Sequence, residues 1–307
     1  PQLRQKGKKM KNLMERLNEA VMKKGPLLAG LDPDMDKLRG LSKEIGYQGA
    51  DCDFLRNYCF EYIETVKDVV CAIKVNIAFF ESIELQAVYW EVLERAKAAG
   101  LFVIADVKRG DIGNTSRQYA KAYMYAESPA DMITINPMFG TDGVQPFLEY
   151  AEKNDKGVFV LTKTSNKSSA EIQDKVVQDE EKTIYQTIGQ LVDKWGKSIS
   201  SETTIYTQVG AVVGATHPTE AKKLREMFPN TFFLVPGYGA QGATAKDIVV
   251  NFDEKGGGAV VNSSRGLMFA YESERWAEKY TASRWADATH DEAERAQKEL
   301  VEAIKNK

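Results

Sequence analysis

The sequence predicts a single (β/α)8 barrel of the α/β class, on three observations. Short apolar runs alternate with segments of helical spacing along most of the chain, and about eight such runs are present. The length of 307 residues is sufficient for one barrel of this kind. Charged or glycine-rich segments follow several of the runs, at the ends where such barrels carry their active sites. An open doubly wound sheet is disfavoured because no G-x-G-x-x-G follows the first run.

The first half of the chain begins with a helix and a strand that have clear ends. Leu13, Leu17 and Val21 have helical spacing, and Gly25-Pro26 ends the helix that they predict over 10–24. The apolar run 27–31 predicts a strand that stops at Asp32-Pro33. The next predicted strands are 69–77, 101–107 and 131–135, and the helices between and after them are 51–67, 82–99 and 114–126.

The second half continues the same alternation. The predicted strands are 157–162, 205–213, 231–235 and 258–262, and the predicted helices are 143–152, 181–195, 219–227, 243–252, 266–271 and 287–306. The polar stretch 163–180 is predicted to be a loop. No linker or repeat divides the chain, so residues 10–307 are predicted to form one catalytic domain. Residues 1–9 are expected to be a disordered arm or a remnant of an expression vector.

Composition limits the kinds of partner. The net charge of -3 and the pI of about 5.7 provide no basic surface for nucleic acid or for an anionic membrane. No apolar run approaches the roughly 20 residues of a membrane-spanning helix, so we expect a cytoplasmic protein. The three cysteines contain no C-x-x-C pair, and only two histidines are present, so no metal site is expected. Acid–base chemistry therefore falls to lysines and carboxylates.

One stretch, 101–116, concentrates the charged groups. It reads LFVIADVKRGDIGNTS, an apolar strand followed by Asp106, Lys108 and Asp111. Residues two apart on an extended chain face the same side, so the side chains of Asp106 and Lys108 should lie together. Gly110 should break the strand and leave Asp111 on a loop or at the next helix. A lone Asp-x-Lys is usually a salt bridge at a solvated rim, but this cluster is larger.

The segments after the seventh and eighth strands indicate a phosphate site. Glycines in P-G-Y-G-A-Q-G at 236–242 would let backbone N–H groups approach an anion, and the following helix would offer its N-terminus. Arg265, just beyond the eighth strand, would add a charged fork. Each feature alone has a plain alternative, a flexible turn or a surface arginine. Together, at the same end of a barrel, they favour phosphate binding.

Six motifs, in order along almost the whole barrel, resemble those of orotidine 5'-monophosphate decarboxylases. The motifs are G-L-D-P-D at 30–34, I-K-V-N at 73–76, D-V-K-R-G-D-I-G-N-T at 106–115, L-T-K-T-S-N at 161–166, P-G-Y-G-A-Q-G at 236–242 and N-S-S-R-G at 262–266. Insertions at about 33–50 and 166–200 and the long C-terminal tail fit the longer bacterial branch of that family. The resemblance implies conversion of orotidine 5'-monophosphate to uridine 5'-monophosphate and CO2, the last step of de novo UMP synthesis, without metal or organic cofactor.

The resemblance also implies catalytic roles. Asp106 would face the substrate carboxylate, and Lys74 would pair with Asp106 and the sugar. Lys108 would protonate C6 of the pyrimidine, which agrees with the general need for a cation beside a developing carbanion. Asp111, with Thr115, would reach into the neighbouring subunit's site and make the active unit a homodimer.

The remaining implied roles concern substrate binding. Asp32 would hold the ribose hydroxyls, and Ser165 would contact the pyrimidine edge. The phosphate would be held by Pro236, Gly237, Gly239, Gln241 and Arg265. Taken singly, Asp32 is equally well a turn former, Ser165 a loop hydroxyl and Thr115 a helix cap.

Three other functions remain as alternatives. A related magnesium-dependent sugar-phosphate lyase would need oxygen ligands at the strand ends. A Schiff-base aldolase using Lys108 or Lys74 would form an adduct that borohydride traps. A non-catalytic barrel that binds a phosphate ligand would have no reason to retain Asp106, Lys108 and Asp111 together.

Overall fold

The strands form a closed parallel barrel, as predicted. The computed structural model describes residues 11–178, 180–201, 203–239 and 242–307. The barrel order is β1-β10-β9-β8-β5-β4-β3-β2, with β1 pairing β10 to close it. Its strands are β1 (Leu27–Leu31), β2 (Ala72–Asn76), β3 (Phe102–Arg109), β4 (Met132–Ile135), β5 (Gly157–Lys163), β8 (Val209–Val213), β9 (Phe233–Pro236) and β10 (Ala259–Ser263).

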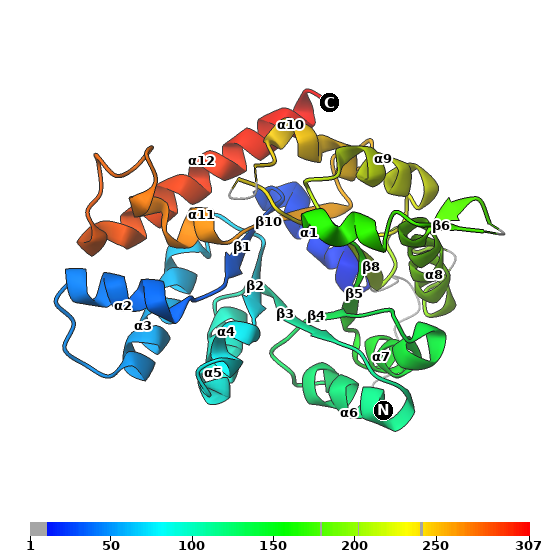
Figure 1. Ribbon diagram of the computed structural model, residues 1–307, viewed down its shortest axis with the longest axis horizontal. Helices are drawn as coiled ribbons and strands as arrows, with labels where there is room; N and C mark the ends of the chain where they lie inside the picture. Colours follow the sequence, from blue (N-terminus) through cyan, green and yellow to red (C-terminus); the bar gives the residue numbers. More distant parts are fainter. Residues whose placement is uncertain (1–10, 179, 202, 240–241) are drawn as a thin grey trace, which may run out of the picture.

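Helices surround the strands (Figure 1). They are α1 (Leu13–Lys24), α2 (Met35–Glu44), α3 (Asp51–Val66), α4 (Ala78–Glu81), α5 (Gln86–Ala98), α6 (Gly113–Met124), α7 (Gly140–Asn154), α8 (Ile184–Ser198), α9 (Pro218–Met227), α10 (Ala245–Ile248), α11 (Arg265–Met268) and α12 (Trp285–Lys305). Short 3-10 turns are η1 (Lys167–Glu171), η2 (Val249–Asn251), η3 (Ala270–Glu272) and η4 (Ala282–Arg284). Within the described ranges, no helix combines the length and apolar character needed to cross a bilayer.

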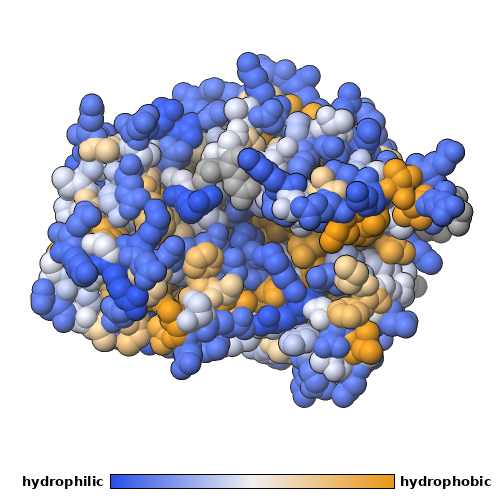
Figure 2. Space-filling model, viewed as in Figure 1, coloured by the Kyte–Doolittle hydropathy of each residue, from blue (hydrophilic) through white to orange (hydrophobic). Residues whose placement is uncertain are grey.

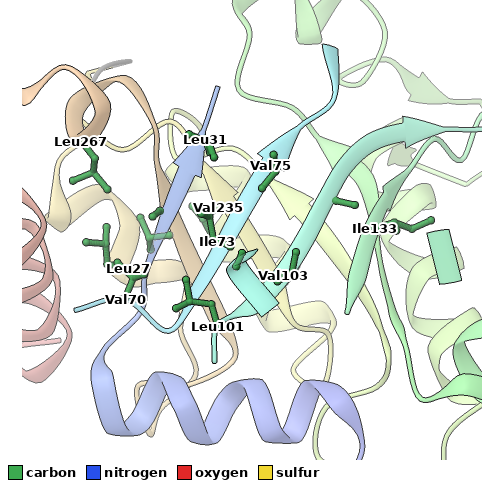
Figure 3. Packing of buried hydrophobic residues seen from close by; sticks show 14 of the residues in the cluster. Leu27, Leu31, Val70, Ile73, Val75, Leu101, Val103, Ile133, Val235 and Leu267 are labelled. Atoms are coloured by element: carbon green, nitrogen blue, oxygen red, sulfur yellow. The ribbon is translucent and has the colours of Figure 1, made fainter. Parts of the chain in front are cut away.

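Strand residues alternate between two apolar layers. Leu27, Ile73, Val103, Ile133 and Val235 belong to the layer between the strands and the outer helices (Figure 3). A second cluster fills the lower interior of the barrel with the intervening residues: Leu28, Ala72, Ile104, Met132, Phe159, Val212, Leu234 and Val260. This alternation is the one expected of a barrel whose interior is packed with side chains.

Helix α1 closes the N-terminal end of the barrel. Its buried face, which includes Leu13, Leu17 and Val21, joins the interior cluster, and Figure 3 shows the helix lying below the strands. The Asn12 side chain accepts a hydrogen bond from the Glu15 backbone, and the Glu15 side chain accepts one from Asn12, a capping box. In the part of the chain that the structure describes, this helix covers the N-terminal end of the barrel, and the C-terminal end of the strands is left for a ligand.

Three predicted elements differ from the structure. Residues 35–44, for which no element was predicted, form α2; Asp34 caps it, and Met35, Leu38 and Leu41 are buried. The predicted loop 163–180 instead contains η1 and one strand of the antiparallel ribbon β6 (Val176–Val177)–β7 (Lys182–Thr183). The predicted helix 243–252 is only the four-residue α10 followed by η2. The 3-10 turn and the two-residue strands of the ribbon are too short for hydrophobic periodicity to detect them.

Candidate active site

The inward-facing positions change from apolar to polar toward the C-terminal end of the strands. Ala72 is followed two residues later by Lys74, Ile104 by Asp106, and Met132 by Thr134. Adjacent strands bring these polar groups together, since Asn76 is in register with Asp106 and Lys74 with Ile104. Asn262 follows Val260 on β10 in the same way. The alternation that packs the barrel interior therefore also builds a polar upper layer.

Asp106 is at the centre of this layer. Its Oδ2 atom is 2.7 Å from Lys74 Nζ, and its Oδ1 atom is 2.7 Å from Lys108 Nζ. The Thr134 hydroxyl donates to Oδ1 at 2.8 Å, and the backbone N–H of Lys108 donates to the Thr134 hydroxyl at 2.9 Å. Lys74 Nζ also lies 3.6 Å from Asp32 Oδ1. An alternating series Asp32–Lys74–Asp106–Lys108 thus runs across three neighbouring strands.

The pairs keep Asp106 and Lys74 charged. Burial by itself raises the pKa of Asp106, but the Lys74 and Lys108 ammonium groups outweigh it and hold this pKa well below its usual range. Burial lowers the pKa of Lys74, but the Asp106 and Asp32 carboxylates outweigh it, so this pKa is raised. A buried carboxylate is therefore held ionised between two cations.

The end of β3 is not a regular strand. The register with β4 shifts between Ala105 and Arg109, and Lys108 has a left-handed backbone with φ of 44°. A non-glycine residue in this region is strained by about 1–3 kcal/mol. The expected meeting of Asp106 and Lys108 is confirmed, but it does not result from simple two-residue alternation. Half of the Lys108 side chain is exposed (51%), so its ammonium group opens onto the cavity above.

A cavity of about 390 Å³ opens above this layer, and a hollow is visible near the centre of Figure 2. The lining residues are Asp32, Lys74, Asn76, Asp106, Lys108, Thr134, Leu161, Thr164, Ser165, Asn166, Val212, Leu234, Pro236, Gly237, Tyr238, Asn262, Ser264 and Arg265. Two of these carry buried acceptors without a hydrogen-bond partner, Asp32 Oδ1 and Asn262 Oδ1. Lys74 Nζ, at 3.6 Å, forms an ion pair with Asp32 Oδ1 but no hydrogen bond, so both oxygens are available to hydroxyl or amide donors of a ligand.

The glycine loop after β9 differs in part from the expected anion cradle. Gly237, Gly239 and Gly242 all have left-handed φ values of 109°, 72° and 91°, a conformation that favours glycine. However, the N–H of Gly239 donates to the Ala243 carbonyl and that of Gly242 to the Gly239 carbonyl. These two donors serve the loop itself, whereas Gly237 and its neighbour Pro236 line the cavity. Gln241 lies outside the described residues.

The helix after this loop is not an open anion site either. Helix α10 has four residues, and the side chain of Asp247 accepts both the backbone N–H and the hydroxyl of Thr244 in a capping box. The Asp247 carboxylate therefore lies beside the N-terminus of this short helix, where it would repel an anion. Arg265, exposed at the start of α11, lines the cavity on the same side, and no described carboxylate pairs with it. Arg265 is thus the cation available to an anionic ligand at this end.

Asp111 and Thr115 lie apart from the cavity. Asp111 is half-buried on the loop before α6, where its Oδ1 atom accepts the N–H of Ile112, and Thr115 is exposed in the first turn of the helix. Neither residue lines the cavity of its own chain. Ile112, Met138 and Phe139 expose large apolar side chains on loops at this same end of the barrel.

Ser165 lies at the cavity wall on the segment that follows β5. The Thr216 hydroxyl donates to its carbonyl at 2.9 Å. Gly214, beyond β8, is packed so closely that an added Cβ would lie 2.7 Å from Ser165 Cα. The absence of a side chain at Gly214 thus permits this close approach. Ser165 therefore lines the cavity just beyond β5, across the barrel from Asp32, which follows β1.

Comparison with known proteins decides the family. The model of the orotidine 5'-phosphate decarboxylase / HUMPS family matches residues 26–280. The chain belongs to this family. A relative from Clostridium acetobutylicum named orotidine 5'-phosphate decarboxylase is 39% identical over 270 residues, which cover 87% of this chain and 92% of the relative. Another of that name from Rhodopirellula baltica is 38% identical, with 91% and 95% covered.

A solved structure extends the likeness to three dimensions. The Leishmania donovani OMP decarboxylase superposes with a TM-score of 0.72 at 30% identity, covering 95% of this chain and 99% of that one. The decarboxylase family is thus matched across the barrel that carries Asp106 and Lys108. The resemblance predicted from six motifs is confirmed at the level of the family.

Sequence reasoning missed several residues of this family member's cavity. Thr134 and Asn262 were not singled out, although both are polar residues at inward-facing positions near strand ends. Each follows a residue of the interior cluster, Met132 or Val260, by two positions, so the alternation of side chains along a strand would have identified both. Asn76, which follows Lys74 by two residues on β2, has the same signal, whereas Thr164 and Tyr238 lie beyond the strands and have none of this kind.

Proposed function

We propose that this chain decarboxylates orotidine 5'-monophosphate to uridine 5'-monophosphate and CO2. Membership of the decarboxylase family and the names of relatives near 40% identity support this activity. The single observation that carries it is Asp106, held ionised between Lys74 and Lys108 on the floor of a closed-bottom cavity. The cytoplasmic location expected from the sequence stays a prediction.

The proposed chemistry centres on Lys108. When the bond between C6 of the pyrimidine and its carboxylate breaks, CO2 leaves and the electron pair remains on C6. The Lys108 ammonium group stabilises that charge and transfers a proton to C6, which completes the product. The half-exposed side chain of Lys108 allows solvent to return the proton.

Asp106 has a different part in this proposal. With its pKa held low by Lys74 and Lys108, its carboxylate stays negative beside the substrate carboxylate. The repulsion between them is relieved as neutral CO2 departs. Interactions with the distant phosphate supply binding free energy that offsets the unfavourable approach.

The binding roles follow the shape of the cavity. Asp32, whose buried Oδ1 atom accepts no hydrogen bond from the described residues, and Lys74 would hold the ribose hydroxyls. Ser165 would contact the pyrimidine edge. Arg265 would bind the phosphate together with the backbone near Pro236 and Gly237, which line the same cavity. The phosphate roles that the family resemblance implies for Gly239 and Gln241 stay predictions.

We also propose that the active unit is a homodimer. Asp111 and Thr115 are outside their own cavity, so their family roles require a second chain. Exposed Ile112, Met138 and Phe139 lie near them, and Met138 is 72% exposed. Burial of such side chains against a second copy would stabilise the dimer and bring Asp111 to the neighbouring cavity.

The test is loss of absorbance when the purified chain meets orotidine 5'-monophosphate in the presence of EDTA. Turnover that survives EDTA and yields equimolar CO2 and uridine 5'-monophosphate supports the proposal. Binding without turnover would indicate a non-catalytic barrel. A borohydride-trapped adduct on Lys108 or Lys74 would indicate Schiff-base chemistry instead.

The magnesium-dependent sugar-phosphate lyase, which the sequence leaves open, is the second candidate, and the description of the matching family model names HUMPS beside the decarboxylases. The geometry favours it less. Both oxygens of Asp106 are engaged by ammonium groups, and Oδ1 also accepts the Thr134 hydroxyl. Activity toward a sugar phosphate that requires added magnesium would favour the lyase.

A further inference from the structure

Lys163, the last residue of β5, is a lysine with no exposed surface. Lysines are almost never fully buried unless they are paired. Its Nζ atom lies 2.7 Å from Asp174 Oδ1 and donates to the Ser169 hydroxyl at 3.1 Å. It also lies 5.8 Å from the ring centre of Tyr185 on α8. The proposed chemistry of the cavity uses none of these four groups.

The side chain of Lys163 points away from the cavity. Leu161, two residues earlier, lines the cavity, so a regular strand would direct Lys163 to the same side. The register with β8 shifts between Leu161 and Lys163, and Lys163 is not among the cavity-lining residues. Its ammonium group instead contacts Ser169 and Asp174 of the segment 164–174 and lies near Tyr185 of α8.

Both polar partners of Lys163 belong to this segment, which also forms one wall of the cavity. Thr164, Ser165 and Asn166 line the cavity. Gln173, next to Asp174, is bound twice to Thr164: its Oε1 atom accepts the Thr164 N–H at 2.9 Å, and its Nε2 atom donates to the Thr164 hydroxyl at 2.8 Å. The segment is thus folded back on itself, with Lys163 bound to its far part.

Residues that follow β8 also contact this segment. The Thr216 hydroxyl donates to the Ser165 carbonyl, and His217 Nε2 lies 3.4 Å from the Ser169 hydroxyl. The ion pair between Lys163 and Asp174 adds a charged contact between β5 and this segment. If it were removed, Asp174 and Ser169 would lose their bond to β5.

We propose that Lys163 is a positioning residue, whose buried ammonium group binds Asp174 and Ser169 and thereby holds Ser165 at the pyrimidine end of the cavity. The inference rests on the proposed function for the identity of the substrate. The ordering of segment 164–174 by Lys163 does not depend on the proposed function, because it is a property of the chain alone. Lys163 touches no substrate in this proposal.

The experiment compares Lys163→Met and Asp174→Asn with a matched control. Lys156, directly before β5, is also buried, and its Nζ atom donates to the Ser128 and Ala130 carbonyls at 2.9 and 2.8 Å. Lys156→Met therefore removes a buried ammonium group from the other end of the same strand. For each chain, kcat and KM for orotidine 5'-monophosphate, hydrogen exchange of 164–174 without ligand, and Tm are measured.

We expect Lys163→Met and Asp174→Asn to raise KM about tenfold, with a smaller change in kcat, and to speed exchange of 164–174 about tenfold. Lys156→Met should lower Tm and leave both KM and that exchange near the wild-type values. If Lys163→Met fails to fold, Asp174→Asn decides, because the Asp174 side chain is 35% exposed and its replacement leaves no void.

Three results would overturn the proposal. They are unchanged KM and exchange in Asp174→Asn, faster exchange with unchanged KM, and an equal rise in KM in Lys156→Met. A wild-type chain without decarboxylase activity would contradict the proposed function instead. The exchange measurement would then still decide whether Lys163 and Asp174 order the segment.

Discussion

Asp106 and Lys108 form a 2.7 Å ion pair although they do not lie on a regular strand. The backbone of Lys108 is left-handed, and its N–H donates to the Thr134 hydroxyl, which in turn donates to Asp106. The strained backbone is therefore fixed by the same network that binds the carboxylate. Strain of this kind persists where the surrounding contacts over-determine it, often at a functional site.

Replacement of Lys108 by alanine should abolish turnover while the nucleotide still binds. Loss of the proton donor is expected to lower kcat by at least about 10²-fold. The measurement is absorbance loss for turnover and calorimetry with uridine 5'-monophosphate for binding. Lys97→Ala is the control, since Lys97 pairs with Asp131 before β4, away from the cavity. Near-normal turnover in Lys108→Ala would refute the role of Lys108 as proton donor.

A second comparison at this position isolates the backbone strain. Lys108→Gly and Lys108→Ala both lack the ammonium group, but only glycine adopts a φ of 44° without steric penalty. The glycine variant should be the more stable of the two by about 1 kcal/mol in urea unfolding. Equal stability would mean that the backbone relaxes in the absence of the lysine.

Replacement of Asp106 by asparagine should destabilise the fold in a pH-dependent way. Lys74 on β2, Lys108 on β3 and the Thr134 hydroxyl on β4 face this carboxylate, and Asp32 on β1 faces Lys74. Removal of one partner of a buried pair is expected to cost about 3 kcal/mol at pH 7. The free energy of unfolding, measured from pH 3 to pH 10 for both chains, tests this.

The directions of the pKa shifts define the pH profile. The pKa of Asp106 is lowered in the folded state, so its contribution is complete above about pH 4 and is lost as the pH falls toward the folded value. The pKa of Lys74 is raised, so its contribution is complete below about pH 10 and is lost only as the pH rises through the folded value. Wild type and Asp106→Asn should therefore approach one another below about pH 4. A constant difference down to pH 3 would contradict this assignment.

Mixing two inactive variants should restore activity if the site is shared. In a dimer of one Asp106→Ala chain and one Asp111→Ala chain, one of the two cavities has both aspartates intact. Random exchange of subunits should then return about one quarter of wild-type activity. Exchange is verified independently by mass-tagged chains. No recovery after verified exchange would argue that Asp111 does not serve a neighbouring cavity.

Replacement of Arg265 by alanine should weaken recognition of the phosphate. We expect KM for orotidine 5'-monophosphate to rise about 10- to 100-fold, while kcat/KM for the phosphate-free nucleoside changes little. Arg284→Ala is a suitable control, because Arg284 is exposed and paired with Asp287 outside the cavity. Equal effects of Arg265→Ala on nucleotide and nucleoside would remove Arg265 from the phosphate site.

The positions of most elements and site residues could be predicted from local patterns. Apolar runs placed all eight barrel strands, and the motifs placed Asp32, Lys74, Asp106 and Lys108 at the strand ends that line one cavity. Helix α2 was missed although its apolar spacing and Asp34 cap were present in the sequence. It is an additional helix between β1 and α3, and the simple alternation of strand and helix gives no place to it.

The sequence by itself determined the order of strands and helices and which residue types stand at the upper, inward-facing positions, because side-chain alternation is a local property of each strand. Only the tertiary structure decided how these residues meet. Closure of the barrel sets the register that brings Thr134 to Asp106, and shifts in that register turn Lys108 toward the cavity and Lys163 away from it. These contacts join residues from separate strands, and no local pattern encodes the register between strands.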